Sequence, residues 1–172
     1  FQVYTDGSLP AEHEDASWAF VILALKDGIT FLHGGMYAKM THSGTVCAAA
    51  KPSSTSAELG ALVWTLLWSI AAAQHVPISI FTDSTSAIGL TIGQFKPSDN
   101  GDLPLLAAML FRFRVSRCPT ACAHVKAHAG HPWNELADWL ASRPQHGLYS
   151  TVPWSIACEA LPSLVLDWLW LG

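Results

Sequence analysis

The sequence has few charged residues and no excess of basic ones. Only 13% of its 172 residues are charged, and the formal net charge is −4. Proteins that bind nucleic acid through charge present a basic patch that neutralises phosphates. The composition provides no such patch, so any role on nucleic acid must depend on local geometry and on metal ions.

The sequence also lacks a cysteine framework. Its cysteines are scattered along a chain that is long enough to bury a hydrophobic core without disulfides. We therefore expect a reducing, intracellular compartment, cytoplasmic or nuclear, rather than secretion. The four cysteines are Cys47, Cys118, Cys122 and Cys158.

Two of these cysteines precede two histidines in the pattern Cys118-x3-Cys122-x-His124-x3-His128, which raises the hypothesis of a zinc site. The spacing lacks the long loop that separates the ligand pairs of zinc fingers. Residues 122–126 also look like a strand, in which alternate residues share a face. We favour buried, apolar roles for the cysteines.

We expect neither a leader nor a membrane span. No positively charged stretch is followed by an apolar segment and a cleavage site, so no secretory signal is visible. The longest apolar run is interrupted by Ser and Gln and is too short for a membrane span. The chain begins at Phe1 inside a strand-like run, from which we expect it to be a piece of a longer polypeptide.

The pattern of apolar residues predicts an α/β fold with a mixed sheet. Strands are expected at residues 2–8, 17–25, 29–36, 77–83 and 122–126, with a further short strand near 45–49. Helices are expected at residues 57–74, 84–92, 103–114 and 132–142. Hairpins give antiparallel pairs and helical crossovers give parallel ones, hence the mixed sheet. Trp64 and Trp68 are expected to pack in the core rather than to stack on bases.

The chain divides into a domain at residues 1–143 and a tail at residues 144–172 that is rich in Pro, Trp and Leu. Prolines and glycines interrupt the pattern of the tail, which closes on the apolar run LVLDWLWL at 164–171. We expect the tail to pack on the domain or on neighbouring sequence. A membrane or partner anchor is the alternative.

Four acids stand where strands end or helices begin, and each has a structural interpretation when taken singly. Asp6 could be a turn acid, Glu58 could complete a capping box with Thr55, and Asp83 could cap the helix that follows it. Asp138 could be a surface acid stabilised by the helix dipole. Four together are harder to explain in this way, because an α/β sheet gathers strand ends at one edge.

A cluster of four carboxylates suits metal-assisted hydrolysis of a phosphodiester. Mg²⁺ prefers hard oxygen ligands, and two such ions activate an attacking water and stabilise the leaving oxygen. His128 lies in a Gly/His/Pro loop before Asp138. It would shuttle protons or help product leave, because imidazole titrates near neutral pH.

The four segments that contain the acids are YTDGS at 4–8, SAEL at 56–59, FTDS at 81–84 and VKAHAGHPWNELAD at 125–138. In this order they resemble the four signature segments of ribonuclease H. The last segment is very specific, the first and third are moderately so, and the second is convincing by its place between them. The resemblance covers residues 1–143.

The resemblance implies a ribonuclease H-like fold, a five-stranded mixed sheet flanked by helices. It also implies cleavage of the RNA strand of RNA:DNA hybrids, which leaves 3′-hydroxyl and 5′-phosphate ends. In such an enzyme Asp6, Glu58, Asp83 and Asp138 would hold two Mg²⁺ ions, with Mn²⁺ as a substitute. His128 would be the auxiliary loop histidine.

Substrate contacts are implied as well. Ser54 and Thr55 stand where the family often uses amides to read the minor groove, and their hydroxyls keep the hydrogen bonding with a shorter reach. Recognition of RNA would depend on contacts to 2′-hydroxyls along the wide minor groove of the hybrid. The expected contact residues are Ser8, Ser54, Thr55, Ser84 and Asn134.

The sequence departs from the cellular members that carry a basic helical protrusion for the DNA strand. Residues 84–120 offer only Lys96, Arg112, Arg114 and Arg117 as basic residues. Free-standing affinity should therefore be weak and salt-sensitive, and tethering to a polymerase would compensate through effective concentration. We interpret the chain as part of a retroelement-type reverse transcriptase polyprotein.

Two other functions are open at this point. A catalytically idle structural or interaction domain of such a polyprotein would keep the fold, but it has no chemical need for four clustered acids. A polynucleotidyl transferase acting on DNA ends would share the sheet. It is not expected to show the His-x-Gly-x3-Asn-Glu-x-Ala-Asp segment.

Overall fold

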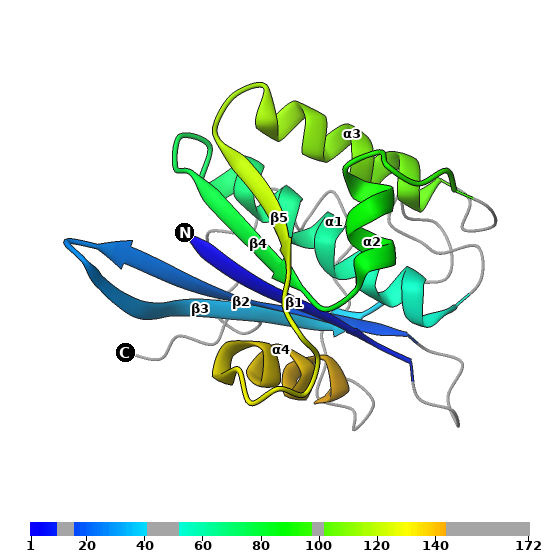
Figure 1. Cartoon of the computed structure of the whole chain (residues 1–172), viewed down its shortest axis with the longest axis horizontal. Helices are drawn as coiled ribbons and strands as arrows, with labels where there is room; N and C mark the ends of the chain where they lie inside the picture. Colours follow the sequence, from blue (N-terminus) through cyan, green and yellow to red (C-terminus); the bar gives the residue numbers. More distant parts are fainter. Residues whose placement is uncertain (10–15, 41–51, 98–101, 144–172) are drawn as a thin grey trace.

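A five-stranded mixed sheet organises the chain (Figure 1). The structure is a computed structural model that describes residues 1–9, 16–40, 52–97 and 102–143. The strand order is β3-β2-β1-β4-β5; β1 is antiparallel to β2 and parallel to β4, and β4 is parallel to β5. The strands are β1 Gln2–Ser8, β2 Ser17–Lys26, β3 Ile29–Lys39, β4 Ile78–Thr82 and β5 Thr120–His124.

Helices cover both faces of this sheet. In Figure 1, α1, α2 and α3 lie on one side and α4 lies on the other. Alternation along β2 serves both layers, because Phe20 and Ile22 pack in the core with α1 while Ala19 and Val21 pack with α4. The helices are α1 Ser54–Ala72, α2 Thr85–Thr91, α3 Leu103–Val115 and α4 Pro132–Ser142.

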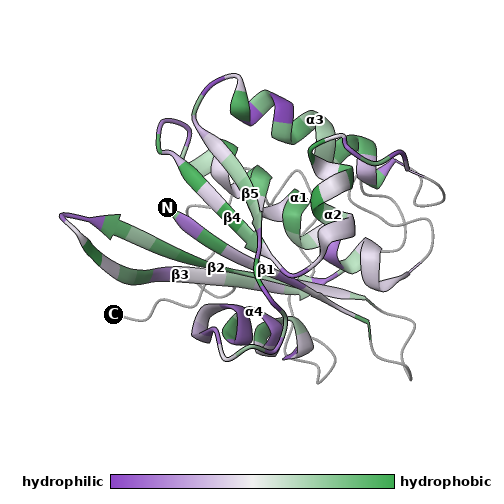
Figure 2. Ribbon diagram, viewed as in Figure 1, coloured by the Kyte–Doolittle hydropathy of each residue, from purple (hydrophilic) through white to green (hydrophobic). Residues whose placement is uncertain are grey.

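The central helix, α1, is buried around most of its circumference. Figure 2 shows how apolar residues gather along this helix and the central strands. Trp64 stacks on Trp18 with ring centroids 4.9 Å apart, and Trp68 is 3% exposed, so the prediction that both tryptophans pack in the core is confirmed. Among the described residues, α1 alone has the length and hydropathy of a membrane-crossing helix, and 78% of the relevant window is buried inside the domain.

The predicted fold class is confirmed, while several element boundaries were wrong. β3 continues to Lys39 because it pairs with β2 along its whole length. β5 begins and ends two residues earlier than predicted because it pairs with β4 from Thr120 to His124. α1 begins at Ser54, three residues early, because Ser53 caps it. The strand expected near 45–49 and the tail at 144–172 lie outside the described residues.

Candidate active site

Three of the four acids meet at one edge of the sheet. Asp6 and Asp83 each lie two residues beyond Tyr4 and Phe81, the last paired residues of the parallel β1–β4 ladder, so register places the two acids side by side. α1 brings Glu58 to them from the other layer. One carboxylate oxygen from each acid lies within 4.8 Å of the others.

Glu58 is available to this cluster because it does not cap α1. The capping box is formed instead by Ser53, whose hydroxyl accepts from the Ser56 backbone N–H at 3.0 Å, and by Ser56, whose hydroxyl accepts from the Ser53 N–H at 2.7 Å. The interpretation of Thr55-x-x-Glu58 as a capping box is therefore wrong. Glu58 lies one turn further along the helix, 7% exposed, with its carboxylate in the acid cluster.

Asp83 is likewise free of the capping role that its position allowed. Ser84 is the N-cap of α2, and its hydroxyl accepts a hydrogen bond from the Ala87 backbone N–H at 3.2 Å. The N-cap interpretation of Asp83 is therefore wrong. Ser84 also belongs to the expected substrate contacts, and its hydroxyl is already engaged in this bond.

Two neighbours fix the position of the Glu58 carboxylate. The Gly7 backbone N–H donates to it, and so does the Thr82 hydroxyl, at 3.3 Å from Oε2. A side chain at Gly7 would place its Cβ 2.2 Å from the backbone of Ala57 and Glu58, so only glycine lets β1 approach the start of α1 this closely.

Thr82 was missed as a member of the site. Alternation along β4 was the signal for it, since Ile78 and Ile80 pack in the core with α1 and Thr82 shares their side. A polar residue continuing that apolar side needs a buried partner.

Burial and the repulsion of neighbouring carboxylates raise the pKa of Asp6 and of Glu58. Burial, and then the charges of Glu58, Asp83 and Asp138, raise the pKa of Asp6 from 3.8 to about 10. Burial, and then the charge of Asp83, raise the pKa of Glu58 to about 8, against the lowering effect of its hydrogen bonds to Asp6, Gly7 and Thr82. Every charged group that perturbs these two acids is a carboxylate.

The donor set fits divalent metal ions. Three convergent carboxylates offer the hard oxygen ligands that Mg²⁺ and Mn²⁺ take. Their mutual repulsion would be relieved by a bound cation, which is the usual reason for burying several acids together. The residues that could hold such ions are Asp6, Glu58, Asp83 and Asp138.

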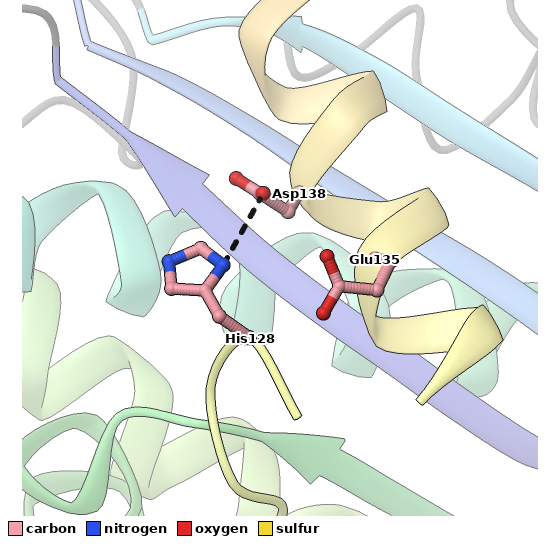
Figure 3. A group of neighbouring side chains, drawn as sticks. All are labelled: His128, Glu135 and Asp138. Carbon is pink, nitrogen blue, oxygen red and sulfur yellow. Dashed lines mark ion pairs between the residues drawn. The ribbon is translucent and has the colours of Figure 1, made fainter. Parts of the chain in front are cut away.

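Asp138 joins the cluster from the opposite layer. It lies on α4 and forms a hydrogen bond with Asp6, which helps to raise the pKa of Asp6. Its Oδ2 is 4.0 Å from Nδ1 of His128, and Figure 3 shows the two side chains facing each other. The His128 side chain is 76% exposed and its φ is 47°, so a loop backbone in the left-handed region presents the imidazole to solvent.

Glu135 stands beside this pair and was not predicted. One ligand atom from each of His128, Glu135 and Asp138 lies within 4.8 Å of the others (Figure 3). The spacing was the available signal, since residues three apart on a helix share a face. Glu135 in the first turn of α4 therefore accompanies Asp138.

A stack of aromatic rings anchors the start of α4. Tyr4 lies between Phe81 and His131, with centroid distances of 4.8 Å to each, and its hydroxyl is 3.4 Å from Nε2 of His131. Tyr4 and Phe81 each precede an acid by two residues and so share that acid's side of the sheet. The stack holds the N-cap of α4, and hence Asp138, against the ends of β1 and β4.

The expected substrate contacts differ in accessibility. Ser54 is exposed, and Ser8, Thr55 and Ser84 are partly exposed around the acid cluster. Thr55 also lines a cavity of about 260 Å³ that reaches Lys96. Asn134 is 3% exposed with its amide oxygen buried. This burial speaks against the direct substrate contact that we expected of it.

The cysteine and histidine pattern does not assemble a metal site. Cys118 and Cys122 are free thiols, and neither belongs to the two metal-ligand groups found among the described residues. Burial raises the pKa of the Cys122 thiol to about 12, which keeps it protonated and a poor ligand at neutral pH. Cys47 and Cys158 lie outside the described residues.

Comparisons with known proteins agree with this architecture. The family model described as RNase H matches residues 1–145. The RNase H1 of Halobacterium salinarum superposes with a TM-score of 0.64 at 18% identity, covering 85% of this chain and 97% of that one. An N-terminal RNase H domain from Mycobacterium tuberculosis gives 0.59 at 13% identity, with coverage of 85% and 97%.

A further similar structure is that of LC11-RNase H1 in complex with an RNA/DNA hybrid. Its TM-score is 0.58 at 18% identity, and the match covers 84% of this chain and 98% of that one. No curated protein matches the sequence. At these identities the structural matches show the fold, while the family model covers most of the sequence. The chain belongs to the ribonuclease H family.

Proposed function

We propose that the protein is a metal-dependent endoribonuclease that hydrolyses the RNA strand of RNA:DNA hybrids. The observation that carries the proposal is the convergence of Asp6, Glu58 and Asp83 within 4.8 Å at the end of two parallel strands. Membership of the ribonuclease H family supports ribonuclease activity in general. The complex of LC11-RNase H1 with a hybrid supports this choice of substrate.

The acids would hold two Mg²⁺ ions, with Mn²⁺ as a substitute. When bound, the ions would supply activation of the attacking water and stabilisation of the leaving 3′-oxygen. Asp6 forms hydrogen bonds with both Glu58 and Asp138, so it would be the central carboxylate of the set that holds the ions. Gly7 and Thr82 keep the Glu58 carboxylate oriented through their hydrogen bonds.

His128 would act as an auxiliary proton carrier. Its ring faces Asp138 on one side and is otherwise largely exposed, so it can take a proton from product and release it to solvent. The hydroxyls of Ser8, Ser54, Thr55 and Ser84 would contact the hybrid along its minor groove.

We also propose that the domain works while tethered to other domains of a longer polypeptide, of reverse transcriptase type. Residues 84–120 carry four basic residues, too few for tight independent binding at physiological salt. Tethering would raise the local concentration of hybrid and so remove the need for high affinity.

The test is cleavage of labelled duplexes by the purified chain. RNA:DNA, RNA:RNA and DNA:DNA duplexes are incubated with and without Mg²⁺, using the wild type, Asp6→Asn and Asp83→Asn. Asp27→Asn is the matched control, because Asp27 lies in the exposed hairpin turn with a φ of 53° that Asn tolerates.

We expect the wild type and the control to cleave only the RNA of the hybrid, and only with metal. The two site variants should remain folded and lose cleavage. Metal-dependent cleavage in both site variants would show that the acids are misassigned. A folded wild type that cleaves no duplex would favour the alternative of a catalytically idle domain.

A further inference from the structure

One face of α3 presents apolar side chains to solvent. Leu105, Met109 and Phe113 are 55%, 68% and 42% exposed, and their spacing of four residues places them on one stripe of the helix. We call these three residues the α3 apolar face. Single exposed hydrophobic residues are ordinary, but a continuous stripe marks a surface that another segment covers.

Basic side chains surround the C-terminal end of this face. Arg112 and Arg114 lie in the last turn of α3, and Arg117 lies over the Phe113 ring with its guanidinium 4.2 Å from the ring centroid. The described residues provide no carboxylate ion pair for any of the three arginines; the pair found there joins His128 to Asp138.

Arg114 is the most unusual of these arginines. It is 1% exposed, and its Nη2 donates to the carbonyl oxygens of Ala73 and Val76. Its Nε and Nη1 are buried with no hydrogen-bond partner. It lines a cavity of about 60 Å³ together with Ile70, Gln74, Phe113 and Arg117. The buried Arg114 donors are closed to an incoming group, whereas the exposed guanidinium of Arg117 beside this cavity is open to a carboxylate.

This basic end is remote from the acid cluster. Arg114 binds the carbonyl that ends α1, whereas Glu58 lies in the first turns of the same helix. The fifteen steps from position 58 to position 73 span about 22 Å of helix. In Figure 1 the end of α3 that leads into β5 lies on the side of the sheet opposite α4. The end of α3 that carries Arg114 therefore lies away from the acid edge.

The tail of the chain is acidic and apolar, which complements the basic and apolar residues exposed on α3. Residues 144–172 contain two acids, Glu159 and Asp167, and no Lys or Arg. Asp167 lies within the apolar run at 164–171, which is otherwise Leu, Val and Trp. The twenty residues from 144 to 163 can span up to roughly 65 Å, so the run can reach either layer of the domain.

The other exposed apolar surface is a poorer match. Leu25 and Ile29 at the hairpin tip are 60% and 67% exposed, but the neighbouring charges of Lys26 and Asp27 oppose each other. Trp139 is also 53% exposed, with Arg143 over its ring, but it is a single side chain. The α3 apolar face combines three exposed hydrophobic residues with arginines that have no carboxylate partner among the described residues.

We propose that residues 164–171 dock on the α3 apolar face of the same chain, with the Asp167 carboxylate received by Arg117. The leucines and tryptophans of the run cover Leu105, Met109 and Phe113. The tail is then an integral cover for the layer of helices that lies far from the acid cluster.

Chymotrypsin tests the docking, because it cleaves after the aromatic and leucine residues of the run. Met109→Glu places a charge in the α3 apolar face, and Leu25→Glu is the matched control on the hairpin. Cleavage after Trp168 and Trp170 is followed by mass spectrometry, and equal melting temperatures confirm that each variant is folded. We expect Met109→Glu to be cleaved at least about tenfold faster, equivalent to about 1.4 kcal/mol, and Leu25→Glu to behave as wild type.

A charge exchange tests the same contact without altering the apolar face. Arg117→Glu and Asp167→Arg should each accelerate cleavage of the tail, and the double variant should restore protection. Equal cleavage rates in the wild type, Met109→Glu and both single charge variants would overturn the proposal.

Two further outcomes identify other occupants. Protection that increases with protein concentration, together with dimers in light scattering, would overturn the proposal in favour of exchange between two copies. If the tail resists chymotrypsin only when phosphatidylcholine vesicles are present, and Met109→Glu does not change this resistance, the proposal would be overturned in favour of a membrane anchor.

Discussion

Asp6→Asn should stabilise the metal-free protein at neutral pH while it removes one of the carboxylates proposed to hold metal. Burial and the neighbouring acids raise the pKa of Asp6 from 3.8 to about 10. Because the pKa of Asp6 is higher in the folded chain than in the unfolded chain, the free energy of unfolding is greatest below the unfolded-state pKa, where both states are protonated. It falls as pH rises from that value through the folded-state pKa. The metal-free wild type should therefore be less stable at pH 8 than at pH 5.

The size of this effect follows from the same pKa. At pH 7 the folded chain retains a proton on Asp6 that the unfolded chain releases above a pKa of 3.8. Each of the roughly 3.2 pH units between 3.8 and 7 costs about 1.4 kcal/mol, so the destabilisation is at most about 4.5 kcal/mol. Asparagine resembles the protonated acid and carries no such cost. We expect Asp6→Asn to gain about 2 to 4 kcal/mol in free energy of unfolding at pH 7 without metal.

Urea unfolding in EDTA at pH 5 and pH 8 measures this gain. Asp27→Asn controls for the change of an exposed acid, and the difference between variants cancels the titration of the histidines. Mg²⁺ should then stabilise the wild type at pH 8 and have little effect on Asp6→Asn. The reasoning is refuted if metal-free Asp6→Asn is less stable than wild type at pH 8, or if the wild type is equally stable at both pH values.

Three other variants probe the surroundings of the acids. Gly7→Ala should destabilise the fold by about 3 kcal/mol or more, because its Cβ would meet the backbone of α1 at 2.2 Å; an unchanged urea midpoint would contradict the close approach. Thr82→Val removes the donor to Glu58 and should weaken Mg²⁺ binding in calorimetry by about tenfold or more. Thr65→Val is its control, since that buried hydroxyl has no partner, and an equal loss in both variants would disprove the positioning role. His128→Ala should keep partial hybrid cleavage in a gel assay, because His128 is not proposed to hold metal. A loss of cleavage as large as that of Asp6→Asn would show that the role of His128 is misassigned.

Periodicity and turn chemistry predicted the sheet and its helices well, because these signals are local. The Lys26-Asp27-Gly28 turn and the continuous apolar run of β2 are examples. Boundaries were less predictable, since they depend on partners distant in sequence. The start of β5 at Thr120 is set by its pairing with Ile78.

The acid cluster was predicted from its motifs, but single residues could not distinguish structural from chemical roles. Glu58 and Asp83 were each plausible helix caps until Ser53, Ser56 and Ser84 were seen to fill those roles. A serine beside an acid offers two candidates for one cap, and only the backbone geometry decides between them. The burial of Asn134 was similarly hidden, because nothing local to that residue reveals what packs over it.

The parallel register of β1 and β4 would make the proposed cleavage activity a sensor of correct folding. Tyr4 pairs with Phe81, and this pairing alone brings Asp6 level with Asp83. A slip of one residue would turn Asp83 to the opposite face, and a slip of two would carry it roughly 6.6 Å along the strand. Either error could preserve much of the secondary structure of the domain. Hybrid cleavage would therefore report strand alignment more sensitively than circular dichroism does.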